Sequence, residues 1–488
     1  MSNVLHQHFT GLLNTGVSDF LLKDNELTAC KNVWTYQIGK IEKVPGYAKC
    51  YASQVIDDKD VNFLHWYYDT GNRTNYLLAT SDEGSDLTLE YRTTGAWATI
   101  GSISTSWDTY ATSQPDMENF LGKTFIVGYK STTTFLPVAT VNATTFSVAD
   151  SDLTDMAQGK YIVRYKDLLY VLHAEVGGTV YPSRAYYSSA PSAGAITWTP
   201  TTDFVEFGYD DGDEITGGIE ALDKLIVFKQ FSMWKYDESI RLKIANIGCD
   251  SFRSIVKVNN VPYWFNRDGF YRWTGAQPEL ISRKIQKFVD AITATKLDEV
   301  VATQYNADEY RAFIGDVTVN GIAYVNTWVC WNTASETWYI RCTNDVAKSA
   351  SNYVEGGKRR AYFGNDDGFV MKFANKIETT PIYADNGNPI NSFFITKNFD
   401  YGVPEDSKLI RHITAYTAKP QGLVMTVDTD NRDEFSATQQ QIINRNVFDA
   451  DINAIGNSFR YKFIETGILE SWELEGFSIE TNVEEDTV

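Results

Sequence analysis

Acidic side chains gather most densely between residues 203 and 214, where their spacing suggests a calcium site. The carboxylates belong to Asp203, Glu206, Asp210, Asp211, Asp213 and Glu214. Hard cations prefer several carboxylate oxygens, which makes Asp210, Asp211 and Asp213 candidate ligands. The stretch lacks the spacing of an EF-hand loop and the glutamate that closes one. A loop with a solvated acidic face is therefore the favoured interpretation.

Two further groups carry weak metal signals. Asp428, Asp430 and Asp433 resemble calcium ligands, but a hairpin turn accounts for them better. His6 and His8 can bind a metal from an extended strand, although a polar stretch that orders against a neighbour is the favoured interpretation. We predict no metal and no cofactor.

No motif supports an enzyme. The sequence has no Gly-x-Ser-x-Gly, no Walker-type glycine-rich loop and no HExxH pair. Cleavage of a glycosidic bond needs two carboxyl groups about 5–9.5 Å apart in different environments, a separation that a sequence does not give. The Asp-Gly turns described below do not match the Ser-x-Asp-x-Gly-x-x-Trp box of sialidase-like propellers. We therefore expect no catalytic activity.

The charge of the chain disfavours a nucleic-acid binder. Its 63 acidic and 43 basic residues leave a net charge of −20. Lys358, Arg359 and Arg360 form a basic run that could contact phosphate, but pairing with carboxylates or with a neighbouring subunit is favoured. The excess of carboxylates would instead repel the phosphate groups of DNA.

Elements that could position these residues are mostly strands. The chain has 27 Phe, 29 Tyr and 12 Trp, and aromatic side chains suit a pleated, half-buried surface. Leu168–Leu172 and Leu225–Phe228 are apolar runs typical of strands buried on both faces. Alternation predicts half-buried strands through Leu423–Val427, Phe459–Phe463 and Trp472–Ile479, the last with a β-bulge at Gly476.

One helix is predicted. It follows Ser282 as N-cap and places Ile285, Phe288, Val289 and Ile292 on one face. We expect this helix to pack on the edge or rim of a sheet.

An internal repeat organises the middle of the chain. YWFNRDGF at 263–270 matches YFGNDDGF at 362–369 at an offset of 99 residues. Each copy predicts a hairpin whose turn is Asp268-Gly269 or Asp367-Gly368, because glycine supplies the positive φ of a tight turn. Tyr76–Ala79, Leu87–Arg92 and Trp97 recur in the same way as Tyr170–Leu172, Arg184–Ser189 and Trp198. At about 45–50 residues for one propeller blade, both offsets correspond to two blades.

These patterns predict an all-β protein with an irregular β-propeller and a C-terminal β-sandwich-like domain. We place the boundaries at 1–50 for an N-terminal arm and first strands, 51–390 for the propeller, with room for five to seven blades, and 391–488 for the sandwich. The final residues, Glu484–Val488, are expected to form a solvated acidic tail.

The five cysteines, widely spaced and without a CxxC pair, indicate neither a disulfide framework nor a zinc site. The first residues lack the basic and apolar regions of a signal peptide, and no apolar run approaches the ~20 residues that span a bilayer. We expect folding in a cytoplasm-like compartment and no membrane anchor.

An ordered series of short segments resembles propeller proteins of bacteriophage particles. It begins at Asn32–Tyr47, where Gly39–Lys43 precede a Pro45-Gly46-Tyr47 turn. It continues through Tyr181–Arg184, Asp211–Asp213, Ile215–Gly217, Leu225–Lys229, Ser251–Ser254, the Asp268-Gly269 hairpin and Ser282. The C-terminal part is similar to the β-sandwich that follows the propeller in hub and nozzle proteins of short-tailed phages.

The resemblance implies a non-enzymatic structural protein of the virion, at the head-to-tail connector or the tail hub or nozzle. It implies a homo-oligomeric ring of six or of twelve copies through which DNA passes during ejection without specific binding. Portal, adaptor or other tail proteins would be its partners. The alternative is a carbohydrate-binding or glycan-cleaving propeller used in receptor recognition, whose exposed aromatic residues stack on sugars.

Overall fold

Strands make up almost all of the regular structure. The computed structural model describes residues 2–37, 39–92, 95–100, 107–376, 378, 382–419, 422–430, 432, 435, 441–467 and 469–483. In that part of the chain the only α-helix is α1 (Gln286–Asp290), accompanied by the short 3-10 helices η1 (Ser151–Leu153), η2 (Phe252–Ser254), η3 (Ser282–Ile285) and η4 (Ala294–Glu299). The predicted all-β class is confirmed.

Six four-stranded antiparallel sheets follow one another along the chain, and in each the strands pair in sequence order. We number them sheets 1–6. Their strands are β7 (Val61–Asp69), β8 (Thr74–Glu83), β9 (Asp86–Arg92) and β10 (Trp97–Thr99); β11 (Gln114–Phe120), β12 (Lys123–Tyr129), β13 (Ala139–Asn142) and β14 (Thr145–Ser147); β15 (Gln158–Tyr165), β16 (Leu168–Val176), β17 (Thr179–Tyr187) and β18 (Phe204–Glu206); β19 (Ile215–Ala221), β20 (Lys224–Lys229), β21 (Met233–Asp237) and β22 (Ile240–Ala245); β23 (Val256–Val258), β24 (Val261–Asn266), β25 (Gly269–Trp273) and β26 (Pro278–Leu280); and β27 (Val301–Tyr305), β28 (Glu309–Val319), β29 (Ile322–Asn332) and β30 (Thr337–Cys342).

Sheet 7 combines segments from two distant parts of the chain. Three consecutive strands, β31 (Ala347–Glu355), β32 (Lys358–Asn365) and β33 (Val370–Phe373), are completed by β6 (Tyr47–Lys49), which pairs antiparallel with β33. The short strands β34 (Ala384–Asp385) and β35 (Asn388–Pro389) extend the sheet beyond β6. A strand from the N-terminal part thus supplies the fourth position of the last sheet.

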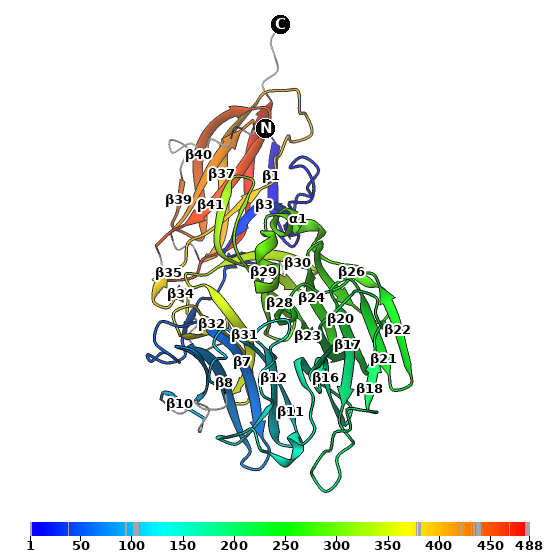
Figure 1. Cartoon of the computed structure of the whole chain (residues 1–488). Helices are drawn as coiled ribbons and strands as arrows, with labels where there is room; N and C mark the ends of the chain where they lie inside the picture. Colours follow the sequence, from blue (N-terminus) through cyan, green and yellow to red (C-terminus); the bar gives the residue numbers. More distant parts are fainter. Residues whose placement is uncertain are drawn as a thin grey trace.

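Contacts between sheets run around a closed cycle. Strand β7 contacts β11, β11 contacts β15, β15 contacts β19, and β19 contacts β24. The cycle continues from β23 to β27 and from β27 to β31, and it returns from β31 to β7. In Figure 1 these sheets form the larger, lower part of the molecule.

The continuous apolar runs lie between neighbouring sheets, as predicted. In β20, Leu225 and Val227 pack with sheet 3, whereas Ile226 and Phe228 pack with Trp264 of sheet 5. Strand β16 is likewise apolar on both faces, toward sheets 2 and 4. Because successive side chains point to opposite faces, a strand covered on both sides must be apolar at every position.

The two internal repeats occupy sheets that are two apart in the cycle. The hairpin of 263–270 joins β24 to β25 in sheet 5, and that of 362–369 joins β32 to β33 in sheet 7. The second recurrence places Trp97 in sheet 1, while Trp198 forms a β-bridge to Ser188 next to sheet 3. An offset near 100 residues therefore spans two sheets.

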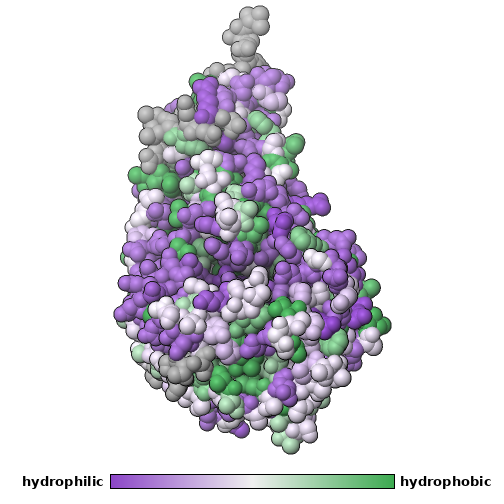
Figure 2. Space-filling model, viewed as in Figure 1, coloured by the Kyte–Doolittle hydropathy of each residue, from purple (hydrophilic) through white to green (hydrophobic). Residues whose placement is uncertain are grey.

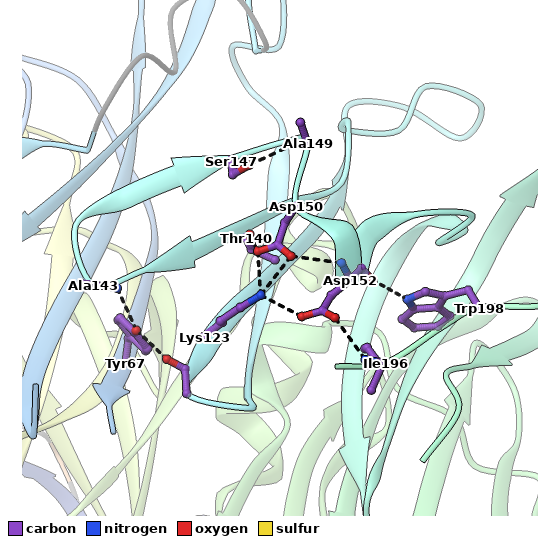
Figure 3. Close-up of polar contacts among 11 residues, drawn as sticks. Tyr67, Lys123, Thr140, Ala143, Ser147, Ala149, Asp150, Asp152, Ile196 and Trp198 are labelled. Carbon is purple, nitrogen blue, oxygen red and sulfur yellow. Dashed lines mark hydrogen bonds and ion pairs between the residues drawn. The ribbon is translucent and has the colours of Figure 1, made fainter. Parts of the chain in front are cut away.

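Polar contacts connect sheets 2 and 3 (Figure 3). The Lys123 ammonium, on β12, donates to both Asp150 oxygens at 2.8 and 2.9 Å and to Asp152 Oδ2 at 2.8 Å. The Asp152 Oδ1 accepts from the amide of Ile196 at 3.1 Å, and the Trp198 indole donates to the Asp152 carbonyl at 2.9 Å. The lysine thus holds a carboxylate that in turn fixes the link between β17 and β18.

Two larger sheets contain both ends of the described chain. Sheet 8 has the order β4 (Val33–Trp34), β5 (Ile41–Lys43), β42 (Glu473–Val483), β37 (Lys408–Lys419) and β40 (Val447–Gly456), with β1 (Ser2–Gln7) paired to β42. Sheet 9 has the order β2 (Leu12–Leu13), β3 (Glu26–Lys31), β36 (Ser392–Thr396), β41 (Phe459–Glu465), β38 (Leu423–Thr429) and β39 (Gln441–Ile443). One hydrophobic core runs through both and continues into sheets 5, 6 and 7.

The predicted bulge is present in β42. Tyr416 pairs with Gly476, but the next residue, Thr417, pairs with Leu474, which leaves Glu475 as an extra residue. The extra residue returns Phe477 and Ile479 to the buried face that Trp472 and Leu474 share. A Cβ on Gly476 would lie 2.7 Å from the His6 carbonyl oxygen, so a residue without a side chain fits this position.

The helix prediction is correct in place and wrong in its start. The apolar positions Ile285, Phe288, Val289 and Ile292 are buried, within η3 and α1 and just after them. Ser282 makes no capping hydrogen bond, and its hydroxyl accepts instead from the amide of Phe270 at 3.0 Å. This serine therefore holds the hairpin of sheet 5. No helix in the described ranges is long and apolar enough to span a bilayer.

Candidate functional site

The first strands of the seven sheets surround a polar cavity. A volume of about 670 Å³ is lined by residues of β11, β15 and β19 together with η2 and β23. A second volume of about 330 Å³ is lined by β7, β27 and β31 and shares four residues with the first, namely Asp116, Phe252, Ile255 and Lys257. We call the two together the central cavity.

Charges of both signs line the larger part of the cavity. Asp116 and Glu118 are two residues apart on β11 and line the cavity together, with Met117 buried between them. Lys257 on β23 forms an ion pair with Glu220 on β19, at 2.6 Å between Nζ and Oε2. Arg164 on β15 contributes a second cation. The site is therefore suited to a polar ligand with groups of both signs.

Both carboxyl groups on β11 retain protons near neutral pH. Burial raises the pKa of Asp116 to about 7, although the amide of Ile162 donates to its Oδ2 at 2.9 Å and favours the ionised form. Burial likewise raises the pKa of Glu118 to about 7. Carboxyl groups that titrate near pH 7 can exchange protons with a ligand, which is a requirement of acid–base chemistry but does not by itself establish it.

Neutral and basic groups line the rest of the cavity. Burial lowers the pKa of His65 on β7 to about 4, and its Nε2 lies 3.1 Å from Asn119 Oδ1. Arg359 reaches the cavity from β32 and donates to Gln304 Oε1 at 3.3 Å. Within the residues that the structure describes, no three histidine, cysteine, aspartate or glutamate side chains form a group that could hold a metal ion.

Carboxylates of the acidic cluster at 203–214 bond to other groups of the same chain. Asp211 pairs with the fully buried ammonium of Lys229 at 2.6 Å. The Asp213 carboxylate accepts from the Ser232 hydroxyl at 2.7 Å and from the amide of Phe231 at 3.0 Å. Asp210 is exposed and takes a positive φ of 53° in the same loop. The Asp211 and Asp213 carboxylates are thus engaged by neighbouring groups of the same chain.

The second acidic stretch is also paired. Asp428 is buried and accepts two hydrogen bonds from Arg460, at 2.5 and 3.1 Å. Asp430 accepts from the amide of Asn457 at 2.7 Å. Asp433 and the acidic segment 484–488 lie outside the described residues.

The predicted turn residues have distinct roles. Asp268 and Asp367 lie in hairpins in which Asn266 Oδ1 and Asn365 Oδ1 accept from their amides, at 3.0 and 3.2 Å. Gly269 and Gly368 follow them with φ of 150° and 81°. Pro45 and Gly46 belong to the link between β5 and β6, and a Cβ on Gly46 would lie 1.9 Å from the Ala384 carbonyl oxygen. Close backbone approach, not a left-handed φ, requires this glycine.

The other polar candidates are the two histidines near the N-terminus, the basic run at 358–360 and the cysteines. His6 is buried between the rings of Phe399 and Phe477, at centroid distances of 4.2 and 4.8 Å, and burial lowers its pKa to about 4. His8 is exposed beyond the end of β1. In the basic run, Arg360 pairs with Glu378 at 3.1 Å. All five cysteines are free thiols.

Sequence reasoning missed the residues of the central cavity. Asp116 and Glu118 belong to β11 of sheet 2 and Lys257 to β23 of sheet 5, and nothing local distinguishes them from solvated charges. A weak signal exists in Gln114–Glu118, where polar and apolar residues alternate in a strand otherwise flanked by buried ones.

Neither a family model nor a curated protein matches this chain. It resembles the solved extracellular domain of a putative hybrid two-component system from B. thetaiotaomicron, with a TM-score of 0.40 and 9% identity over 72% of this chain and 44% of that one. A second structure of that domain, described as part of a putative one-component system, gives a TM-score of 0.41 and 9% identity over 72% and 45%. A computationally designed protein, Ika8, gives 0.35 and 7% identity over 66% and 99%.

The chain therefore spans less than half the length of the two sensor domains that it matches. With TM-scores below 0.5, these likenesses fix neither a family nor a function.

Proposed function

We propose that this protein is a structural subunit of a bacteriophage particle, assembled as a ring at the head-to-tail connector or the tail hub or nozzle. In this role sheets 1–7 form a seven-bladed, irregular β-propeller, and sheets 8 and 9 form the β-sandwich that accompanies it. The protein holds a conduit for DNA and performs no bond chemistry. Portal, adaptor or other tail proteins bind on either side of the ring.

The observation that carries the proposal is the closed cycle of sheets completed by β6. Contacts run from sheet to sheet and return to the start, and a strand from residues 47–49 supplies the fourth position of sheet 7. Because β6 directly precedes sheet 1 in the chain and pairs within sheet 7, it connects the first and last sheets. A propeller closed in this way leaves only short sheet edges exposed.

The segments that resemble phage propeller proteins lie on elements of the sheet cycle. Tyr47 is the first residue of β6, the strand that completes the cycle, and Gly46 directly precedes it. Ser251–Ser254 include the 3-10 helix η2, which lines the central cavity. Tyr181–Arg184 and Leu225–Lys229 lie in β17 and β20. Fold alone does not determine function, so the functional part of the proposal rests on this resemblance.

Charge and surface support a protein that assembles with copies of itself and lets DNA pass. A net charge of −20 disfavours retention of phosphate. Figure 2 shows a largely hydrophilic face that is interrupted by hydrophobic residues over the lower sheets. Apolar side chains are also exposed on outer strands, among them Ile240 and Leu242 on β22 and Ile455 on β40. Closed rings form when two such different surfaces meet around a rotation axis.

The test is assembly. The purified full chain, alone and mixed with any portal and adaptor proteins encoded near its gene, is imaged by negative-stain electron microscopy and weighed by mass photometry. We expect closed rings of six or of twelve copies. A chain that stays monomeric in every mixture, and is absent from purified particles by mass spectrometry, would contradict the proposal.

A further inference from the structure

A second pocket lies at the surface of sheet 3, apart from the central cavity. It has a volume of about 600 Å³ and is lined by β17, by the end of β18 and by the loop 207–214. We call it the side pocket. Its wall contains Tyr181, Arg184, Glu206 and Tyr209, together with His173 from β16.

The loop that forms one wall is held rigidly. Lys229, fully buried, donates to the Phe207 carbonyl at 2.9 Å and to Asp211 at 2.6 and 2.8 Å. The Ser183 hydroxyl donates to the Asp213 carbonyl at 3.2 Å, which ties the loop to β17. A preorganised wall loses little conformational entropy when a ligand binds. The acidic cluster of the sequence therefore serves to shape this loop.

The opposite wall presents a fixed pair of charges. Arg184 donates through Nε to Glu206 Oε2 at 2.5 Å. Its guanidinium lies 4.1 Å from the centre of the Tyr181 ring and 4.4 Å from that of Phe204. Stacking between two rings holds the guanidinium in one plane, so its free N–H groups and the Glu206 carboxylate keep constant positions.

His173 lines the pocket from a strained position. The residue has a φ of 50°, and the pairing of β16 with β17 slips between Leu172 and Ala174. Bulges and left-handed non-glycine residues concentrate where a side chain has been re-aimed for function. Its Nδ1 lies 3.2 Å from the Ile215 carbonyl oxygen, and burial lowers the pKa of the ring to about 4. The neutral ring that donates from Nδ1 carries an acceptor at Nε2.

Tyr209 completes the pocket with an aromatic ring that is 75% exposed. Gly208, Asp210 and Gly212 around it all have positive φ, which directs the loop outward at this point. An exposed aromatic ring on a rigid loop offers a flat apolar face on which the ring of a ligand can stack.

We propose that the side pocket binds an uncharged saccharide, with a sugar ring stacked on Tyr209 and its hydroxyl groups bonded to Arg184 and Glu206. A guanidinium that donates and a carboxylate that accepts suit hydroxyl groups, which do both. Arg184 pairs with Glu206 at 2.5 Å and Lys160 with Glu214 at 3.4 Å, so these charges are balanced within the chain and the pocket suits an uncharged ligand. This activity goes beyond the ring assembly proposed above and does not depend on it.

The experiment applies the purified full chain to an immobilised library of neutral glycans. Saturation-transfer NMR with glucose, galactose, mannose and N-acetylglucosamine then measures direct contact. Tyr209→Ala and Glu206→Gln are compared with Tyr68→Ala, a change at a half-exposed tyrosine of β7 away from the pocket. We expect reproducible binding of at least one neutral sugar, weakened tenfold or more by each pocket variant and unchanged by the control.

Signals at background for the whole library and for all four sugars would overturn the proposal. Binding that survives Tyr209→Ala would overturn it as well. Circular dichroism and thermal unfolding check that each variant is folded, and the exposed position of Tyr209 makes a folded variant the expected result. Ring assembly is measured separately by microscopy, so the two proposals can fail independently.

Discussion

At the scale of single residues, buried ion pairs join parts of the chain that are far apart in sequence. Lys43 of β5 and Glu465 of β41 are completely buried and lie 2.7 Å apart. Arg341 of β30 pairs with Asp385 of β34 and donates to Asn32 Oδ1 at 2.9 Å. Hydrophobic residues of similar volume could hold these strands together equally well. Charged pairs also disfavour other strand registers, because a displaced strand would leave a buried charge unpaired.

Removing one member of such a pair should destabilise the whole chain. Lys43→Met leaves the Glu465 carboxylate buried without its cation, and we expect a loss of about 3–5 kcal/mol in the free energy of unfolding. Urea unfolding followed by tryptophan fluorescence measures the change. The double variant Lys43→Met with Glu465→Gln should recover part of the loss, and a double variant as unstable as the single one would contradict this explanation.

The raised pKa of Asp116 predicts a pH dependence of stability. An unfolded aspartate has a pKa near 3.9, whereas the folded one titrates at about 7. Between these values the folded chain holds a proton that the unfolded chain has released, so this residue's stabilising contribution is complete below about pH 4 and is lost as the pH rises to 7.

Asp116→Asn removes this titration and keeps an oxygen that can accept from the amide of Ile162. We expect the variant to gain about 1–3 kcal/mol relative to the wild type between pH 4 and pH 8, a range that allows for water in the cavity. Urea unfolding at several pH values measures the gain. Asp57→Asn, at an exposed carboxylate, is the control and should track the wild type. Parallel pH profiles for Asp116→Asn and the wild type would contradict the prediction.

At the scale of elements, β6 is the strand on which closure of the cycle depends. The amide of Gly46 donates to the Ile382 carbonyl at 2.8 Å, and the Gly46 carbonyl accepts from Ala374 at 2.9 Å. The Tyr47 hydroxyl donates to the Asp345 carboxylate. The centroid of the Tyr47 ring lies 5.2 Å from that of the Phe363 ring. The position of β6 is therefore fixed by the backbone hydrogen bonds of Gly46 and by the buried ring of Tyr47.

Gly46→Ala should open this closure. The new methyl group would overlap the Ala384 carbonyl, and because both groups are backbone or bonded to it, relief requires movement of β6 or β34. Overpacking of this kind costs about 1–3 kcal/mol. Gly95→Ala, where a Cβ meets nothing within 4 Å, is the control. Hydrogen exchange of β33 should accelerate in the first variant only, and equal exchange in both would remove β6 from its assigned role.

The elements that could be predicted from the sequence are those with a local signal. A run apolar at every position identified β20, and a repeated Asn-x-Asp-Gly identified two hairpins. A phase slip predicted the bulge at Gly476, and the extra residue is its neighbour Glu475. The pairing of β6 with β33, about 320 residues apart, has no local signal, because strand partners are chosen by packing over the whole chain. The start of the helix was wrong because Ser282 bonds to a neighbouring hairpin, which a capping rule does not include.

At the scale of the whole molecule, the central cavity arises only where sheets meet. Asp116 and Lys257 reach one cavity from sheets 2 and 5, so their proximity depends on the closed cycle and not on any spacing in sequence. The side pocket lies within one sheet and its following loop, and its acidic residues were visible as a cluster, although their role in shaping a loop was not. Local features of a site are therefore predictable, whereas features shared between sheets require the fold.

The proposed assembly into a ring depends on the outer surface of the whole subunit. Sheet 4 ends in β22, where Ile240 and Leu242 are 64% and 50% exposed, and sheet 8 ends in β40, where Ile455 is 55% exposed. Outer strands with apolar side chains attract other chains unless they are covered, so these two edges are where we expect neighbouring subunits to meet. Because a closed ring uses two different surfaces of each subunit, damage to either one should prevent closure.

We therefore expect Leu242→Asp and Ile455→Asp each to reduce the fraction of rings at least tenfold in mass photometry and negative-stain images. Both side chains are exposed, so the thermal unfolding of the monomer should stay within about 0.5 kcal/mol of the wild type. Leu21→Asp, at a residue that is 75% exposed in the link between β2 and β3, is the matched control and should leave rings intact. If rings form normally with both edge variants, the subunits meet elsewhere, and β22 and β40 are edges that the protein leaves open.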